Sequence, residues 1–587
     1  MLKFELVNRQ QDCIVPNGED YMYEYKGRLM NARVNAFYFP GLIATLSITA
    51  SMFLDIAVVG QMLGPVAMGA VNLALPLTMV FNMVYMLLGI GGEVLVSAAK
   101  GAGNKVEANK LFSLSIFTII AISIVCTLVG LSAGKQVAIA LSRGDGDMEI
   151  LVAQYIHIMF IVAPLLIGVT SMTYFVKVDA LPKLAAGIMV FINVVSLISK
   201  VIYLGPLQMG IAGAAYGTMT GFVAGLLLLV PYLFFRRNRT LEFVALSVKD
   251  FRHLGNIIVA GLPPALGQGL GAVAAFCTNV VILDIAGKSG IIVITVCSSI
   301  SIFISSFRYA ATSAMVPIVG ALFGERDWWS MYQVAMRITK MVMGCVAASV
   351  ILIEIFPDKL LGFFGVHDVE VMNIGVPALR IYAVGLLLAS VNYILMTYMQ
   401  TTSRKVFSIA ISVGNEVLAV IFVYLLGYGF GNIGIWSHNI AASLVLLILI
   451  ILTAKYIGRT SNGKYQGIFI HEVRPDFVRG NSIYATPDEA AGYTDMIGEF
   501  FADNQVPTQV LADTKKLIHQ TVMEIVEKEK NPKKTIDIMA LVYDGYIKVR
   551  LRDDSRAPET MKIESDERIS RLSVMGYNNT YIKVPVH

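Results

Sequence analysis

Charged residues are scarce in this chain, and cysteine and histidine are scarcer still. Asp, Glu, Lys and Arg make up 15% of the 587 residues, against about 25% in an average soluble domain. The five cysteines show no close pairing and four lie inside apolar runs, while the seven histidines are scattered. We therefore expect no disulfide framework, no metal site and no resident cofactor.

The net charge of +5 is small, and the basic residues lie in loops between apolar runs. This pattern does not point to nucleic acid as a partner. If the N-terminus is cytoplasmic, the inward loops hold fifteen Lys and Arg residues and the outward loops four. By the positive-inside rule, we expect a plasma-membrane protein with both termini in the cytoplasm. Residues 1–34 have no apolar core and are not a signal peptide.

Long apolar runs dominate the chain, which is 56% hydrophobic with a mean hydropathy of +0.68. Many runs are long enough to cross a hydrocarbon core of about 30 Å. The twelve predicted spans are 37–60, 71–98, 112–133, 151–175, 185–204, 210–235, 256–283, 290–319, 335–356, 376–399, 406–428 and 435–457. The predicted fold is an all-α polytopic membrane protein, whose surroundings are the lipid bilayer.

The twelve predicted spans form an internal repeat of two six-helix units. Pro40 precedes Asp55 by 15 positions, and Pro264 precedes Asn279 by the same number. The two halves are offset by 264 − 40 = 224 residues, and 279 − 55 gives the same value. Two pseudo-symmetric bundles are typical of secondary transporters, which build their site between repeats. The predicted function is therefore transport, and the chain is not an enzyme.

Five segments follow from this organisation. A cytoplasmic N-terminal segment precedes the first bundle, a cytoplasmic linker joins the two bundles, and an α+β domain follows them. The boundaries are 1–34, 35–235, 236–255, 256–457 and 458–587.

Several short motifs resemble the multidrug and toxic compound extrusion (MATE) family of cation-coupled antiporters. They occupy residues 55–64, 70–76, 101–104, 178–183, 205–215, 261–263 and 320–325. The resemblance implies a V-shaped pair of six-helix bundles. It also implies export of small amphipathic compounds, often cationic, in exchange for H⁺ or Na⁺. We expect a monomer.

Charged side chains inside the spans are the candidate site residues, because each costs about 2.5–3.5 kcal/mol at mid-bilayer. Asp55 matches the acid of the family's first-helix motif, which implies a role in ion coupling. Glu93 follows two glycines and belongs either to a substrate cavity or to a local ion pair. Glu416 leaves the same alternatives open, and Asn279 is a cavity candidate as the repeat counterpart of Asp55.

Two basic residues are not expected in a site that binds only cations. Relatives carry an Asn and an Asp where this chain has Ser196 and Lys200. Lys200 is either an internal cation for an acid such as Asp55, a selector of anionic substrates, or a packing ion pair. Arg308 is permanently charged, so it neutralises an acid or holds a carboxylate or phosphate. The pair makes an anionic or zwitterionic substrate a candidate.

The tail from residue 458 reads as a small α+β domain. A strand is predicted at 466–473, helices at 487–503 and 507–530, and a hairpin at the Asp544-Gly545 turn. Alternating apolar residues up to Val586 predict a last strand.

The order of these elements resembles the histidine-kinase-like ATPase fold of anti-sigma factors. The resemblance places Glu524, Asp553 and Asp554 at its nucleotide site. Lys528 stands where that family has a magnesium-binding Asn, and Ser555 where it has a Gly. The domain is therefore predicted to be degenerate and regulatory, with a cytoplasmic protein or ligand as its partner.

Two alternatives stay open. One is a flippase or exporter for lipid-linked oligosaccharides or anionic substrates. The other is a membrane sensor or kinase, which needs a phospho-accepting histidine; His519 is the tail's only candidate.

Overall fold

The structure is a computed structural model of the chain. It describes residues 27–142, 146–235, 239–461, 465–472, 477–504, 506–529, 531, 533–543, 545–554, 567–574 and 577–586. The chain forms two compact units. One contains 1–35, 463–465 and 472–587, and the other contains 36–462 and 466–471. Each unit is described by itself.

The first half of the membrane unit is helical. Its elements are α1 (Arg28–Leu63), α2 (Pro65–Leu73), α3 (Leu75–Tyr85), the π-helix η1 (Met86–Ile90), α4 (Gly91–Gly101), α5 (Lys105–Ser142), α6 (Gly146–Val178), α7 (Pro182–Leu204), α8 (Gly210–Val230) and the π-helix η2 (Pro231–Phe235). Helices α4 to α8 pack against one another as the first bundle.

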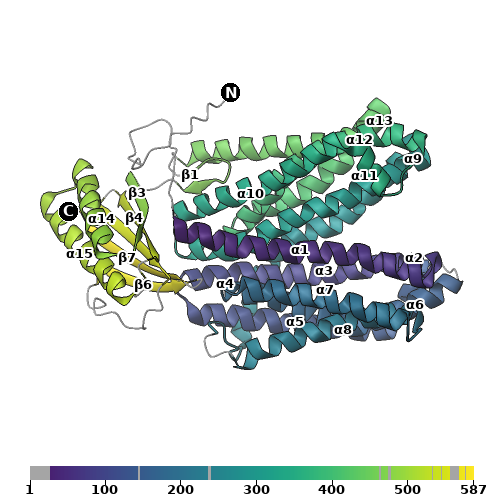
Figure 1. Cartoon of the computed structure of the whole chain (residues 1–587), viewed down its shortest axis with the longest axis horizontal. Helices are drawn as coiled ribbons and strands as arrows, with labels where there is room; N and C mark the ends of the chain where they lie inside the picture. Colours follow the sequence, from purple (N-terminus) through teal and green to yellow (C-terminus); the bar gives the residue numbers. More distant parts are fainter. Residues whose placement is uncertain are drawn as a thin grey trace. The chain divides into compact units, whose positions relative to one another are not determined.

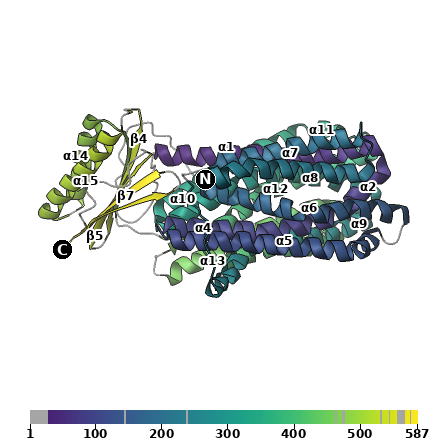
Figure 2. The ribbon, with the colours of Figure 1, turned by 90° about the horizontal axis from the view of Figure 1, so that it is seen from below.

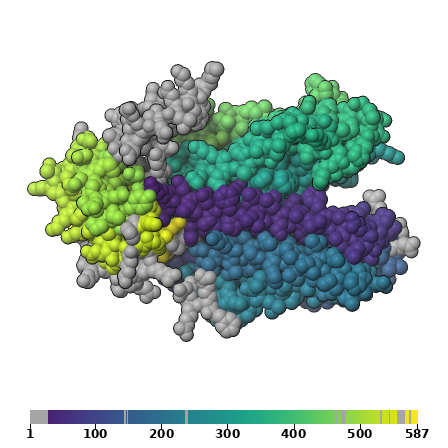
Figure 3. Space-filling view, viewed as in Figure 1, coloured from purple at the N-terminus to yellow at the C-terminus, as the bar shows by residue number. Residues whose placement is uncertain are grey.

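The second half is built in the same way. Its elements are the 3₁₀-helix η3 (Val248–His253), α9 (Leu254–Gly324), α10 (Trp328–Ile355), α11 (Pro357–Phe363), α12 (Val369–Thr401) and α13 (Lys405–Thr460). Helices α9, α10, α12 and α13 pack together as the second bundle. Figure 1 shows them in teal and green on one side of α1, with the helices of the first half on the other side. The space-filling view shows α1 exposed between the two groups (Figure 3).

Ten helices in the described part of the chain are long and apolar enough to cross a membrane. All twelve predicted spans fall on them, because α9 and α13 each cover two. With 71 residues, a straight α9 would be about 105 Å long, more than three times the hydrocarbon thickness. Non-helical backbone at Gly287 interrupts α9, and Gly431 interrupts α13. The count of twelve crossings stays a prediction.

The repeat is visible in the backbone conformation of the turns. Residues with positive φ recur in pairs 223 positions apart, as in 287 − 64 and 403 − 180. The pairs are Gly64 and Gly287, Gly103 and Arg326, Ala180 and Ser403, and Gln208 and Gly431. The offset is thus 223 rather than 224. It makes Thr278 the counterpart of Asp55 in place of Asn279.

Helices α4 and α9 join the two bundles through paired glycines. A Cβ at Gly101 would lie 1.9 Å from the carbonyl oxygen of Ala321, and one at Gly324 would lie 2.0 Å from that of Ala98. Because 324 − 101 and 321 − 98 both equal 223, the two contacts are related by the repeat. Only glycine permits such close backbone contact, so the bundles are held together at the ends of α4 and α9.

The C-terminal unit is a five-stranded antiparallel sheet with two helices. The strands are β3 (Phe477–Tyr484), β4 (Thr535–Tyr543), β5 (Tyr546–Asp553), β6 (Ile569–Val574) and β7 (Tyr577–Pro585), in the order β3-β4-β5-β7-β6. Helices α14 (Pro487–Asp503) and α15 (Thr508–Lys528) lie on one face of the sheet (Figure 2). The predicted apolar face of α15, which includes Ile518 and Val522, is buried against the sheet. The α+β fold, both helices and the hairpin strands are confirmed, while Asp544 lies outside the described residues.

The predicted strand at 466–473 is wrong. Gly467 and Ile470 have positive φ, so the segment turns between two short strands, β1 (Tyr465–Gln466) and β2 (His471–Glu472). The carbonyl of Phe469 accepts a hydrogen bond from Arg404 at 2.9 Å, and its ring packs edge-on against Tyr398. The apolar residues of this segment therefore pack on the membrane unit. The alternation of apolar and polar residues in the sequence did not distinguish this arrangement from a strand in a sheet.

The first turn of α1 belongs to the C-terminal unit. The Asp537 carboxylate on β4 accepts hydrogen bonds from the backbone N–H groups of Leu29 and Met30, both at 3.4 Å. The Tyr577 hydroxyl donates to the carbonyl of Leu29 at 2.8 Å. Arg28 lies over the ring of Tyr484, 5.0 Å from its centroid. A carboxylate of the sheet thus satisfies helical N–H groups that have no partner within the helix.

We predict that Gly324→Ala destabilises the contact between the bundles. The new methyl group would overlap the carbonyl of Ala98, and such overpacking costs about 1–3 kcal/mol. The apparent melting temperature in detergent should fall by several degrees. Gly344→Ala on α10 is the control, because its Cβ meets nothing within 4 Å. If the two variants had the same apparent melting temperature, the close contact between α4 and α9 would be contradicted.

Candidate transport site

Asp55 on α1 and Lys200 on α7 form an ion pair in which the lysine is buried and the acid is partly buried. The Lys200 Nζ lies 2.7 Å from Asp55 Oδ2, and the two side chains are 5% and 30% exposed, respectively. Asp55 Oδ1 is also buried, and no hydrogen bond to it is found in the described part of the chain. Of the three sequence alternatives for Lys200, the contact agrees both with an internal cation for Asp55 and with a packing ion pair. Breaking such a pair by removing one partner costs about 3–5 kcal/mol.

Glycines on α8 make room for Lys200. A Cβ at Gly217 would lie 2.3 Å from Lys200 Cγ and 2.9 Å from its backbone nitrogen. Four residues further on, Gly221 faces Ser196 in the same way. The close packing of α7 on α8 therefore fixes the backbone that carries Lys200, and α1 supplies the acid.

Glu93 is held in a second ion pair. Its Oε1 lies 3.2 Å from Lys177 Nζ on α6, and its side chain is fully buried. The Lys177 ammonium also lies over the ring of Tyr174, 4.3 Å from the centroid. Of the two sequence alternatives for Glu93, the local ion pair is the one observed. Lys177 was missed because it lies just beyond the predicted span and was assigned to a loop.

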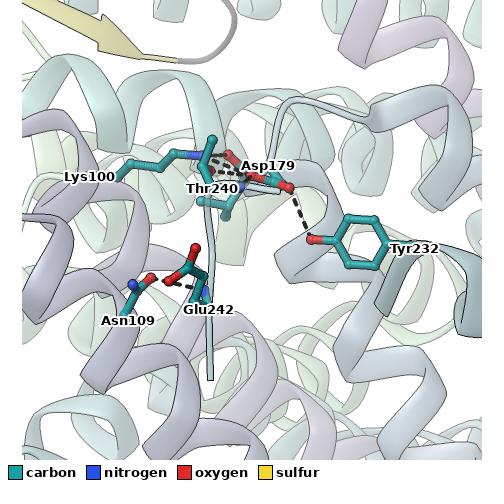
Figure 4. Close-up of polar contacts among 7 residues, drawn as sticks. Lys100, Asn109, Asp179, Tyr232, Thr240 and Glu242 are labelled. Atoms are coloured by element: carbon teal, nitrogen blue, oxygen red, sulfur yellow. Dashed lines mark hydrogen bonds and ion pairs between the residues drawn. The ribbon is translucent and has the colours of Figure 1, made fainter. Parts of the chain in front are cut away.

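A third acid fastens the linker between the bundles. Asp179, after α6, accepts hydrogen bonds from Lys100 at 3.4 Å, from Tyr232 at 3.2 Å and from the backbone N–H of Thr240 at 3.0 Å. Nearby, the N–H of Glu242 donates to Asn109. Figure 4 shows these groups around the extended linker strand. The linker is therefore bound to the first bundle by its Thr240 and Glu242 segment.

Arg308 and Glu416 line one cavity in the second bundle. The cavity has a volume of about 160 Å³ and is lined by residues of α9, α12 and α13, with Met86 of η1. Arg308 and Glu416 form no ion pair, because no nitrogen of Arg308 lies within 4.0 Å of a carboxylate oxygen of Glu416 in the described structure. Asn279 is exposed and does not line this cavity, so its prediction as a cavity residue is not supported.

Tyrosines lie between the buried charges of the two halves. Tyr85 on α3 packs on Tyr174 of α6 with ring centroids 6.3 Å apart. In the second bundle, Tyr309 packs edge-on against Tyr393 at 5.8 Å, and Arg308 lies over the Tyr393 ring. Such rings combine a large apolar surface with a polar tip. Sequence analysis did not single them out, because tyrosine carries no charge to mark it in an apolar run.

The acids predicted for a nucleotide site in the tail all have protein partners. Glu524 binds Lys528 one turn along α15 at 2.7 Å. Asp553 accepts a hydrogen bond from Asn578 at 3.0 Å, and Asp554 lies 3.1 Å from Lys534. Ser555 falls outside the described residues. Among the searched residues, no group of three or more Asp, Glu, His or Cys is arranged to hold a metal ion.

Two repeated helical bundles, with buried charges on their helices and a polar cavity, define a membrane transporter rather than an enzyme. The MatE family model matches the chain twice, at residues 40–202 and 263–425. The chain belongs to this family. The two matches start 263 − 40 = 223 residues apart, in agreement with the offset seen in the turns.

Relatives and solved structures agree with this assignment. The multidrug export protein MepA of Staphylococcus saprophyticus is 22% identical over 442 residues, which cover 74% of this chain and 96% of that protein. MepA of Staphylococcus aureus is 22% identical over 437 residues, covering 74% and 95%.

Among solved structures, a multidrug resistance MATE family transporter of the MOP superfamily, in an outward-facing conformation, has a TM-score of 0.67 at 22% identity. It covers 76% of this chain and 100% of that one. A MOP superfamily transporter from Pyrococcus furiosus, described as having a binding pocket of reverse polarity, has a TM-score of 0.67 at 21% identity and covers 74% and 97%. These similarities show the fold.

Proposed function

We propose that this protein is a proton-coupled antiporter that exports small amphipathic compounds across the plasma membrane. The Asp55–Lys200 ion pair carries the proposal, together with membership of the family. The MepA relatives are multidrug exporters by name, which supports a broad range of substrates. We also propose that the chain crosses the membrane twelve times with both termini in the cytoplasm, because this orientation places most of the basic loops inside.

The ion pair favours a proton over Na⁺ as the coupling ion. A sodium ion on Asp55 would lie within about 5 Å of the Lys200 ammonium. Repulsion over that distance is worth about 3 kcal/mol at an effective dielectric constant of 20. A proton also adds one positive charge and removes the attraction between Asp55 and Lys200, but it is bound by the carboxylate itself and needs no coordination space beside the ammonium.

Protonation of Asp55 changes the contact between α1 and α7. The neutral acid no longer attracts Lys200 by charge, so the contact that holds the two helices weakens. A potential of 100 mV contributes about 2.3 kcal/mol per charge, and each pH unit about 1.4 kcal/mol. Together they are comparable to the cost of opening one buried pair. The pair is therefore suited to switch the first bundle between two arrangements.

The flippase alternative receives less support. Recognition of a lipid-linked oligosaccharide would require several cavity cations. Lys200 and Lys177 are buried and each is paired with an acid, and only Arg308 lines the second-bundle cavity as a basic residue. The sensor-kinase alternative needs an accessible nucleotide site, whereas the tail acids are paired with neighbouring side chains.

We further propose that the tail regulates transport through α1. The first turn of α1 is bound to β4 and β7 by Asp537 and Tyr577, and the same helix continues to Asp55. A cytoplasmic ligand or protein that alters the sheet would then act on the helix that carries the coupling acid. The paired acids at Glu524 and Asp554 support a domain that has lost nucleotide binding.

Asp55→Asn should abolish coupling without preventing insertion. In proteoliposomes, wild type should export a cationic dye such as ethidium under a pH gradient, and not under a Na⁺ gradient alone. The variant should lose at least tenfold in gradient-driven rate. Asp284→Asn is the control, because Asp284 is an exposed acid on α9 that accepts a hydrogen bond from Tyr428. Flux driven by Na⁺, or wild-type flux in Asp55→Asn, would exclude the proposed coupling.

The stability of the C-terminal unit, which includes the first turn of α1, should depend on pH through Asp537. Burial raises the pKa of the Asp537 carboxyl above its usual 3.8, although hydrogen bonds from Ser482, Leu29 and Met30 oppose the shift. A raised pKa means that folding favours the protonated acid. The stabilisation is therefore complete below pH 3.8 and declines as the pH rises through the raised pKa. The equilibrium constant for folding changes by at most tenfold per pH unit.

Hydrogen exchange of residues 28–35 in the full-length protein, corrected for intrinsic rates, measures this decline. Asp537→Asn should remove the pH dependence of protection. Asp513→Asn should retain it, because Asp513 is an exposed acid paired with Arg568. The same pH dependence in wild type and Asp537→Asn would assign the effect to another group.

A further inference from the structure

The lining of the second-bundle cavity contains one cation and one anion. Arg308 on α9 and Glu416 on α13 both line it, yet no ion pair joins them in the described structure. They interact electrostatically over a longer distance, without the direct contact that joins Asp55 and Lys200. The arrangement leaves the charges available to a ligand.

One buried nitrogen of Arg308 lacks a hydrogen-bond partner among the described residues. The Arg308 Nη2 donates to Ser305 Oγ on the same helix, and the guanidinium lies 5.6 Å from the centroid of the Tyr393 ring. The Nε of Arg308 is buried with no hydrogen-bond partner. A buried donor without a partner costs about 1–3 kcal/mol. A bound anion would remove this cost.

Glu416 and Asn392 supply hydrogen-bond acceptors to the same cavity. Glu416 Oε1 accepts one hydrogen bond, from Asn415 at 3.0 Å. Asn392 donates through Nδ2 to the carbonyl of Ser443 at 2.9 Å, while its Oδ1 is buried without a partner. A carboxylate and a free amide oxygen in one cavity match the N–H groups of a protonated amine.

We propose that this cavity binds the zwitterionic head group of an exported compound. Its carboxylate, or another compact anionic group, lies at Arg308, and its ammonium lies between Glu416 and Asn392. A volume of about 160 Å³ is close to that of a cavity that holds benzene. The head group is therefore small, and the apolar remainder of a larger compound extends toward the tyrosines. The proposal rests on the proposed export function and names the substrate class of the second bundle.

The two halves then have different tasks. With an offset of 223, the counterpart of Arg308 is Tyr85 and that of Glu416 is Asn193. The opposed charges of the cavity are thus absent from the first bundle, where Lys200 neutralises Asp55. Proton coupling belongs to the first bundle and recognition of substrate charge to the second.

The test is equilibrium binding to full-length protein in nanodiscs, with three matched probes. These are 4-(aminomethyl)benzoic acid, which is zwitterionic, its methyl ester, which is a cation, and its N-acetyl derivative, which is an anion. Wild type should bind the zwitterion at least tenfold more tightly than either derivative. Arg308→Gln should weaken the zwitterion and the anion by tenfold or more and spare the ester. Glu416→Gln should weaken the zwitterion and the ester and spare the anion.

Arg380→Gln is the matched control, since Arg380 pairs with Glu354 on a partly exposed surface away from the cavity. Equal binding of all three probes, or a parallel loss of all three in both cavity variants with a lowered melting temperature, would overturn the proposal. Dye efflux under a pH gradient is measured on the same variants. Selective binding without efflux would contradict the proposed antiport function and support the proposed binding site. Efflux without probe selectivity would contradict the binding site and support the antiport function.

Discussion

The energetic cost of placing charge in a low-dielectric interior is the constraint on which this structure depends. An acid at mid-bilayer is stable only with a partner, and Asp55 and Glu93 each have a lysine from a neighbouring helix. Each pair joins two helices that are otherwise held by apolar packing. Neutralising one acid therefore changes a contact between helices, which is how a proton can act on the arrangement of a bundle.

The two halves share a repeated backbone scaffold but differ in their charged residues. The turns repeat with an offset of 223 residues, and so do the glycine contacts of Gly101 and Gly324 that join the bundles. The charges do not repeat. Asp55 corresponds to Thr278 and Arg308 to Tyr85, so two similar scaffolds carry different chemistry. One pairs its acid with an internal cation, and the other keeps opposite charges apart around a cavity.

Hydropathy was sufficient to place every predicted span on an apolar helix, and the resemblance identified the family. Charge in an apolar run was sufficient to find Asp55, Lys200, Arg308 and Glu416. Sequence alone did not show that Arg308 and Glu416, 108 positions apart, line one cavity, because this depends on the packing of α9 and α13. Lys177 was missed since it adjoins a loop, and the strand at 466–473 was wrong since its apolar residues pack on the membrane unit.

The most direct test of the account is infrared difference spectroscopy of the carboxyl groups of the purified protein on acidification. The account predicts a protonated-carboxyl band that is present in wild type and is absent in Asp55→Asn. The band should not respond to Na⁺. A band unchanged in Asp55→Asn, or one that disappears when Na⁺ is added, would contradict proton coupling at the Asp55–Lys200 pair.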